Sequence, residues 1–344
     1  MNAVSFDTAA APVIALAIGD PAGVGPELAA KLLADPDIRA AASLLVVGDL
    51  RVLQRGAADS GITLDIDVRS PGDPIVFAGK PILIDLANLD PRTIERGVAA
   101  EAGGRSALAN FSACLRIAGA GKAAAVCFTP FNKAAMRLSH PPYDDEIGYV
   151  SEILGIDCPA SEFNILEGLW NARVTSHVPL SKVASLITTE RVLSDIRLTN
   201  TSLLEAGIAH PRIGVAGLNP HAGDGGNFGH EDDQIIRPAV EAAQREGIGA
   251  DGPYPPDTVF VRATKGAFDA VLTMYHDQGQ IAMKLIGFDT GVTLLGGFPF
   301  PICTPAHGSA YDIAGKGVAN LGASKAAVLL AAKMARKNIA RAAA

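Results

Sequence analysis

The chain has 344 residues, of which 49% are apolar and 5% aromatic, and a formal net charge of −7. This length fits one large two-lobed unit or two domains. Acidic and basic residues are interspersed without a basic stripe, which argues against nucleic acid or an anionic membrane as a partner. The four cysteines are widely spaced and form no CxxC pair, as expected for reduced thiols in a cytosolic protein.

The N-terminal part of the chain lacks the features of a targeting or membrane segment. No Lys or Arg precedes Lys31, and the first apolar stretch contains Pro12 and leads directly into Gly19-Asp20-Pro21. This pattern fits neither a signal peptide nor a transmembrane helix. We therefore expect a soluble cytoplasmic enzyme.

Short apolar runs alternate along the chain with Ala-rich, helix-like stretches. Strands separated by helices indicate βαβ units, a largely parallel sheet and hence an α/β fold. The expected strands are Val13–Ile18, Leu44–Val47, Ile82–Ile84, Ala124–Phe128, Ala172–Ser176, Ile213–Gly217 and Ala270–Met274. The clearest expected helices are Glu27–Leu33, Gly104–Ala118, Ile235–Glu246 and Ala323–Ala344.

Three of the polar turns that follow expected strands contain a histidine. These are His177 in TSHVPL, His221 in NPHAGDGG and His276 in MYHDQG. Ligands of open α/β sheets bind at the carboxyl ends of the strands. One such histidine alone would be a structural residue, but three in equivalent positions suggest a divalent metal site. Zinc is the first expectation, with Asp224 and Asp277 as further ligands or as carboxylates that orient the imidazoles.

The most specific pattern is a set of segments spread over nearly the whole chain. They are GDPAGVGPE (Gly19–Glu27), TPFNK (Thr129–Lys133), TSHVPL (Thr175–Leu180), LNPHAGDGGNFG (Leu218–Gly229), PPDTVF (Pro255–Phe260), MYHDQGQ (Met274–Gln280) and HGSAYDIAGKG (His307–Gly317). Together and in this order, these segments resemble the 4-hydroxythreonine-4-phosphate dehydrogenase family, known as PdxA.

This resemblance implies two αβα lobes, similar to isocitrate and isopropylmalate dehydrogenases, with the site in a cleft between them. We expect a cofactor-side lobe of residues 1–128 plus 290–344, and a metal-binding and dimerisation lobe of residues 129–289. The resemblance also implies an obligate homodimer with shared active sites. In it, His177 and His221 of one subunit and His276 of the other would hold the metal.

The segment HGSAYDIAGKGVAN is similar to the nucleotide-binding loop of isopropylmalate and isocitrate dehydrogenases, which oxidise a 2-hydroxy acid and then decarboxylate it. This similarity places His307, Asp312 and Asn320 near the adenosine end of the cofactor. A carboxylate at Asp312 can accept hydrogen bonds from ribose hydroxyls and repels a 2′-phosphate, so we expect NAD, with NADP still possible. The alternative is a Gly-rich loop that only caps a helix.

The resemblance further implies oxidation of a secondary alcohol near a carboxylate, followed by decarboxylation. Asp277, Asp257 and Lys284 are candidates for proton handling or substrate positioning. Lys284 matches a substrate-binding lysine of the family. Each of the three could instead belong to an ordinary surface ion pair.

The substrate positions depart from the family pattern. Members that use the phosphorylated substrate carry GHTE after the NK motif, whereas here Glu146 replaces the histidine and Ile147 the threonine. Thr293 stands where the family has a substrate Asn, and Ile302 where it has an Arg. A carboxylate 4 Å from a phosphate charge costs about 4 kcal/mol at an effective dielectric near 20, and a fork-shaped Arg partner is lost.

We therefore expect a non-phosphorylated substrate, such as a cis-dihydrodiol carboxylate, as in the terephthalate dihydrodiol dehydrogenases. One alternative is an authentic 4-hydroxythreonine-4-phosphate dehydrogenase of pyridoxal phosphate biosynthesis, in which residues 144–146 merely cap a helix. A phosphate acetyltransferase is disfavoured because it needs neither the histidines nor the HGSAYDIAGKG loop. A non-catalytic metal-binding protein would have no use for that loop.

Overall fold

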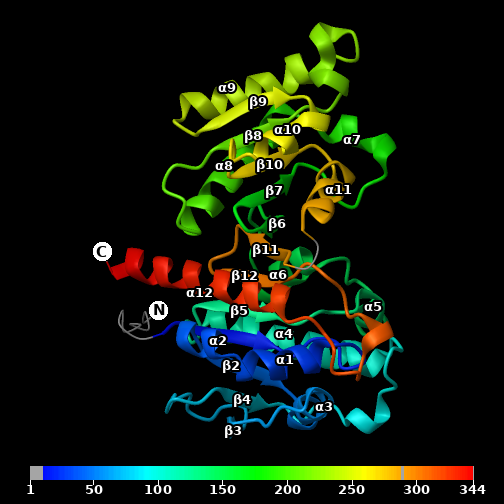
Figure 1. Cartoon of the computed structure of the whole chain (residues 1–344), viewed down its shortest axis with the longest axis vertical. Coiled ribbons are helices and arrows are strands. Elements are labelled where there is room, and N and C mark those ends of the chain that lie inside the picture. The colour runs from blue at the N-terminus through cyan, green and yellow to red at the C-terminus, as the bar shows by residue number, and fades with distance from the viewer. Residues whose placement is uncertain (1–10, 288–289, 344) are drawn as a thin grey trace. The chain divides into compact units, whose positions relative to one another are not determined.

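The computed structural model describes residues 11–287 and 290–343, and the chain is an α/β protein (Figure 1). It divides into two compact units, Met1–Cys158 with Phe298–Ala344, and Pro159–Gly297. The expected lobe boundary at 128/129 lies earlier than this division. The difference arises because α5 (Lys133–Ser139) and α6 (Glu146–Leu154) pack on α4 (Glu101–Gly119). The other expected boundary involves residue 289, which lies outside the described residues.

The first unit contains a sheet with the strand order β3-β4-β2-β1-β5-β12, and the pairings between its described strands are parallel. Successive side chains of β1, β2 and β5 are buried almost throughout, so helices cover both faces of this sheet. The strands are β1 (Val13–Ala17), β2 (Ser43–Gly48), β3 (Asp67–Arg69), β4 (Ile82–Asp85), β5 (Ala125–Phe128) and β12 (Ile302–Pro305). The remaining helices of this unit are α1 (Gly25–Ala34), α2 (Pro36–Ala41), α3 (Leu50–Ser60) and α12 (Gly322–Ala343).

The second unit contains the strand order β11-β6-β7-β10-β8-β9. The sequence predicted a largely parallel sheet, but β6 pairs antiparallel with both β7 and β11. Gly168, with a φ of 77°, closes the tight turn between β6 and β7, and a turn this short can only join antiparallel strands. The strands are β6 (Ser161–Leu166), β7 (Leu169–Arg173), β8 (Ile213–Ala216), β9 (Ala250–Tyr254), β10 (Ala270–Thr273) and β11 (Val292–Gly296). The helices are α7 (Leu180–Leu186), α8 (Thr189–Glu205), α9 (Arg237–Arg245), α10 (Pro256–Ala263) and α11 (His276–Ile286).

The expected strands and helices are all present, although β7 lies a few residues earlier than expected. A π-helical turn, Asp232–Ile236, precedes α9. None of the described helices is both long enough and apolar enough to cross a membrane.

The parallel strands bring polar loops together at their carboxyl ends within each unit. In the first unit, Gly19 N donates to Thr129 Oγ1 at 2.8 Å, and Val24 N donates to Ser309 O at 3.0 Å. In the second unit, the loops after β7 and β10 run side by side. His177 lies in the first of these loops, and His276 follows the second as the first residue of α11.

Candidate functional site

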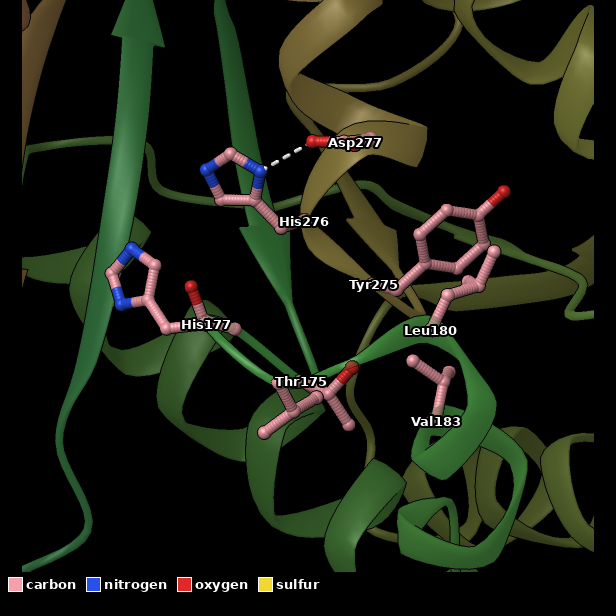
Figure 2. Close-up of a pocket in the computed structure, with 9 residues that line it drawn as sticks. Thr175, His177, Leu180, Val183, Tyr275, His276 and Asp277 are labelled. Carbon is pink, nitrogen blue, oxygen red and sulfur yellow. Dashed lines mark hydrogen bonds and ion pairs between the residues drawn. The ribbon is translucent and has the colours of Figure 1, made fainter.

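The neighbouring strands β7 and β10 place two histidines in one pocket. Their ladder continues past the strand ends, where Thr175 N donates to Met274 O at 3.1 Å and Thr175 Oγ1 donates to the same oxygen at 2.8 Å. His177 and His276 follow these residues, and their ring centroids are 5.6 Å apart. Figure 2 shows the two rings next to each other at one side of the pocket.

The pocket has a volume of about 390 Å³ and combines polar and apolar walls. The imidazoles and Asp277 form its polar side, and Tyr275 with the side chains of α7 forms its apolar side (Figure 2). Small-molecule sites have this composition, with a few convergent polar groups in an apolar cavity. The lining residues are Thr175, Ser176, His177, Val178, Leu180, Val183, Tyr275, His276 and Asp277.

Asp277 is the direct partner of the His276 imidazole. His276 Nδ1 lies 2.7 Å from Asp277 Oδ1, so the ring donates its Nδ1 proton to the carboxylate. The lone pair of Nε2 is then left free to bind a cation. A carboxylate that orients an imidazole in this way is the usual support of a metal-binding histidine.

Two of the predicted metal ligands adopt a left-handed backbone. The φ angle is 53° at His177 and 54° at His221, and Ala222 and Asp224 next to His221 have φ angles of 54° and 45°. Such a conformation costs a non-glycine residue roughly 1 kcal/mol or more, and it is concentrated at functional sites. The left-handed backbone at His177 and His221 therefore costs the folded protein conformational free energy.

His221 does not join the other two histidines within the single chain. Its ring packs near Phe228, with the centroids 6.0 Å apart, and it does not line the pocket of His177 and His276. Among residues 11–287 and 290–343, no group of three His, Cys, Asp or Glu side chains is arranged to hold a metal ion. The predicted three-histidine set is thus only partly assembled in one chain.

The other predicted catalytic residues lie outside this pocket. Asp257 is exposed in the first turn of α10, and Lys284 is exposed on α11. Lys284 follows His276 by eight residues, which corresponds to roughly 12 Å along the helix axis. Asp224 Oδ2 accepts a hydrogen bond from Asn227 Nδ2 at 3.0 Å.

The predicted substrate residues at the start of α6 form local contacts. Glu146 Oε2 lies 3.1 Å from Lys133 Nζ, and the preceding Asp145 caps the helix by accepting from Gly148 N at 2.9 Å. Ile147 is half-buried. Helix capping therefore accounts for Asp145, whereas Glu146 is engaged with the lysine of the TPFNK segment.

The remaining two substrate positions lie inside strands. Thr293 in β11 is 7% exposed, and its Oγ1 accepts a hydrogen bond from Asn164 Nδ2 at 3.3 Å. Ile302 in β12 is completely buried and pairs with Val126. Neither residue lines the histidine pocket.

The predicted cofactor residues lie on the loop between β12 and α12. Asp312 and Asn320 are exposed, and His307 is half-buried. The Asn320 side chain accepts from Gly322 N at 2.8 Å, so it also caps α12. Asn320 thus has a local contact at the start of α12, whereas the exposed Asp312 can still contact a ligand.

Sequence patterns did not reveal Arg173, although it supports the histidine pocket. Its side chain is nearly fully buried, pairs with Glu162 at 2.8 Å and bonds to Asn164. Its Nε donates to Ser176 Oγ at 3.1 Å, next to His177, and Asn164 also accepts from Gln280 of α11. The one signal in the sequence was a charged residue, Arg173, at the end of an otherwise largely apolar strand.

Comparison with known proteins identifies the family. The family model described as "Pyridoxal phosphate biosynthetic protein PdxA" matches residues 40–331. The chain belongs to the PdxA family. "Putative 4-hydroxythreonine-4-phosphate dehydrogenase 2" of Rhizobium meliloti is 57% identical over 335 residues, which are 97% of this chain and 96% of that protein. A "Putative D-threonate 4-phosphate dehydrogenase" of Symbiobacterium thermophilum is 38% identical, with coverages of 94% and 97%.

Solved structures of similar proteins share this fold. The structure of "a putative 4-hydroxythreonine-4-phosphate dehydrogenase from Salmonella typhimurium" matches with a TM-score of 0.81 and 33% identity, covering 94% of this chain and 100% of that one. A terephthalate 1,2-cis-dihydrodioldehydrogenase from Burkholderia xenovorans matches with a TM-score of 0.64 and 31% identity, covering 92% and 96%. The expected family and fold class are confirmed, and this PdxA-family chain is a dehydrogenase acting on a CH–OH group.

Proposed function

We propose that this chain is a metal-dependent, NAD-linked dehydrogenase that oxidises a secondary alcohol near a carboxylate and then releases CO₂. The observation that carries the proposal is the shared pocket of His177 and His276, in which Asp277 orients the second imidazole. Two imidazoles side by side, one of them held by a carboxylate, form a donor set suited to a first-row divalent metal.

The chain's own groups fit such a metal. The left-handed backbone of His177 and His221 aims these side chains from short loops, and the bond to Asp277 leaves Nε2 of His276 free. Zinc is the first candidate. When bound, the metal would polarise the substrate hydroxyl and stabilise the negative charge that develops on its oxygen.

The proposal includes a homodimer whose sites combine residues of two subunits. Because His221 stands apart from His177 and His276 in one chain, an intact site needs a further ligand from elsewhere. Large apolar side chains are exposed at the pocket, at Val178 and Leu180 near the start of α7, and further along α11, at Ile281 and Leu285. Their exposed fractions are 38% for Val178, 69% for Leu180, 61% for Ile281 and 83% for Leu285. Exposed apolar groups next to a site favour an interface there.

The cofactor is proposed to be NAD. Asp312 is exposed on the loop between β12 and α12, where its carboxylate can accept hydrogen bonds from ribose hydroxyls. The same negative charge would repel the 2′-phosphate of NADP.

The substrate is proposed to carry a carboxylate but no phosphate. Lys133 already forms an ion pair with Glu146. Arg137 already donates to Tyr143 O and Asp144 O, at 3.1 Å each. A phosphate dianion placed beside Lys133 would meet the Glu146 charge, at a cost of about 4 kcal/mol per charge pair at 4 Å before solvent screening reduces it. Resemblance to the terephthalate dihydrodiol dehydrogenase structure favours a cis-dihydrodiol carboxylate.

A phosphorylated substrate is the second candidate, and the names of near full-length relatives favour it. One screen separates the two. NADH formation is measured with the zinc-loaded enzyme on carboxylated dihydrodiols, 4-hydroxythreonine 4-phosphate and D-threonate 4-phosphate, and CO₂ release is followed in parallel. We expect the highest kcat/KM on a non-phosphorylated diol. A far higher value on either phosphate would overturn this substrate assignment and leave the dehydrogenase assignment standing.

A further inference from the structure

Two side chains of α1 hold the end of the loop that carries the proposed cofactor residues. Lys31 Nζ donates to Gly317 O at 3.1 Å and to Ala319 O at 2.7 Å. Glu27 Oε1 accepts from Lys31 Nζ at 2.7 Å and from Ala319 N at 2.8 Å. We call this pair the Glu27–Lys31 clamp. It satisfies both backbone groups of Ala319.

The clamp differs from an ordinary ion pair on a helix surface. Pairs spaced i and i+4 usually lie on a solvated face and contribute little to the stability of the helix. Here the side chains of Glu27 and Lys31 are 2% and 19% exposed. Burying charges is expensive unless they are hydrogen-bonded. Lys31 Nζ and Glu27 Oε1 bond to a residue 288 and 292 positions away in sequence, whereas no described group satisfies Glu27 Oε2. Helix α1 could form without these bonds to Gly317 and Ala319.

The other parts of the same loop are attached to α1 as well. Val24 N donates to Ser309 O at 3.0 Å near the start of the loop. Val24, Leu28 and Ala319 form one buried apolar cluster, against which Ile313 and further loop residues pack. The loop is thus held at both ends, while Asp312 between the ends and Asn320 directly after Ala319 stay exposed.

We propose that Glu27 and Lys31 are positioning residues for the dinucleotide. They set the backbone of residues 317–319 and thereby place Asn320 and, through the loop, Asp312. A loop ordered before the ligand arrives spares the ligand the entropic cost of ordering it. This inference rests on the proposed use of the loop as the NAD site.

The test compares Lys31→Met and Glu27→Gln with Arg105→Met in the full-length protein. Arg105→Met is the matched control, because it breaks an exposed i,i+4 pair with Glu101 in the same unit. The Kd for NAD is measured by fluorescence, and hydrogen exchange of residues 317–321 is measured without NAD. We expect NAD binding to weaken about 10- to 100-fold in the clamp variants, by analogy with the loss of a residue that orients a metal ligand.

Three further readouts separate positioning from general stability. Exchange at the amide of Ala319 should accelerate, kcat at saturating NAD should stay near the wild-type value, and Lys31→Arg should restore most of the affinity because it can still donate to both carbonyls. If Lys31→Met does not fold, Lys31→Gln replaces it, since the amide keeps a donor but loses the charge. Arg105→Met should bind NAD like the wild type.

The failures are distinguishable. A wild-type protein that does not bind NAD overturns the proposed cofactor and this inference with it, before any variant is made. A wild type that binds NAD, together with clamp variants that bind it equally well, overturns the positioning role alone. The positioning role is likewise overturned if exchange accelerates without any change in NAD affinity, or if Lys31→Arg binds NAD as weakly as Lys31→Met.

Discussion

Lys133 and Glu146 form an ion pair, with 3.1 Å between Nζ and Oε2, at the beginning of two helices of the first unit. The lysine belongs to the TPFNK segment, and the glutamate stands where phosphate-using relatives are expected to have a histidine. The side chains are 40% and 19% exposed, so a ligand can approach the pair. In the function proposed above, this contact is the feature that disfavours a phosphorylated substrate.

Replacing Glu146 by Gln should shift the preference towards phosphorylated substrates. The change frees the Lys133 ammonium and removes the repulsion of about 4 kcal/mol per charge pair, which screening reduces at this partly exposed site. We expect the ratio of kcat/KM for 4-hydroxythreonine 4-phosphate to that for a carboxylated diol to rise about tenfold or more, equivalent to about 1.4 kcal/mol. Glu152→Gln, on the same helix, is the control. An unchanged ratio would remove Glu146 from the specificity argument.

Asp277→Asn should weaken metal binding without unfolding the protein. The carboxylate accepts the Nδ1 proton of His276, and an amide supports the imidazole less well. Loss of such a supporting group usually costs about 10- to 100-fold in metal affinity. Zinc affinity is measured by competition with a chelator, with the exposed Asp233→Asn as control. Equal affinities of wild type and variant would show that Asp277 does not support a ligand.

Mixing His177→Ala chains with His276→Ala chains tests whether the His177 and His276 of one metal site come from different subunits. If one subunit contributes His177 and the other His276, a mixed dimer keeps one intact site, and random exchange should restore about a quarter of the wild-type activity. In the single chain the two rings are only 5.6 Å apart. If both serve the same chain's site, every site in the mixture is damaged. Absence of restored activity after verified subunit exchange would place the His177 and His276 of one site in the same chain, and the partner's contribution would then have to be another residue, such as His221.

Asp312→Ala should reduce the discrimination between NAD and NADP. The exposed carboxylate can bind ribose hydroxyls, and it repels a 2′-phosphate. The expected change is a lower kcat/KM with NAD and an equal or higher kcat/KM with NADP. Both cofactors are compared at one ionic strength, because screening affects the repulsion. A wild type that already prefers NADP contradicts the assignment.

Asp195 in α8 predicts a specific pH dependence of stability. Burial raises the pKa of this carboxyl from its ordinary value of 3.8 to about 7, and no described hydrogen-bond partner satisfies its Oδ2. The folded protein therefore holds this proton more tightly than the unfolded chain. Stability should fall as the pH rises from about 4 to 7, by about 1.4 kcal/mol per pKa unit of difference.

The measurement is urea unfolding of the wild type and of Asp195→Asn at pH 5 and pH 8. The asparagine carries no charge, so its advantage over the wild type should be larger at pH 8. Glu190→Gln changes an exposed acid on the same helix and should show no such trend. Equal advantages of Asp195→Asn at both pH values would contradict the raised pKa.

Much of the fold and the family could be predicted from the sequence alone. Strands such as β1 and β10 are buried on both faces, so they appear as uninterrupted apolar runs that are recognisable without a structure. Each motif segment is a continuous stretch of sequence, so the segments and their order can be recognised without a structure. Strand β6 was missed because Glu162 and Asn164 interrupt its apolar pattern. Their partner Arg173 becomes apparent only when β6 pairs with β7.

Only the tertiary structure decided which of the singled-out residues meet. His177 joins His276 because β7 and β10 are neighbours in the sheet, whereas His221 lies apart in the same chain. Glu27 and Lys31 look like a plain helical pair in the sequence, yet they bond to the backbone of Ala319, 292 and 288 residues away. Local periodicity records which side of a helix or strand is apolar. It carries no information on which loops the sheet order brings together, because that depends on contacts between distant parts of the chain.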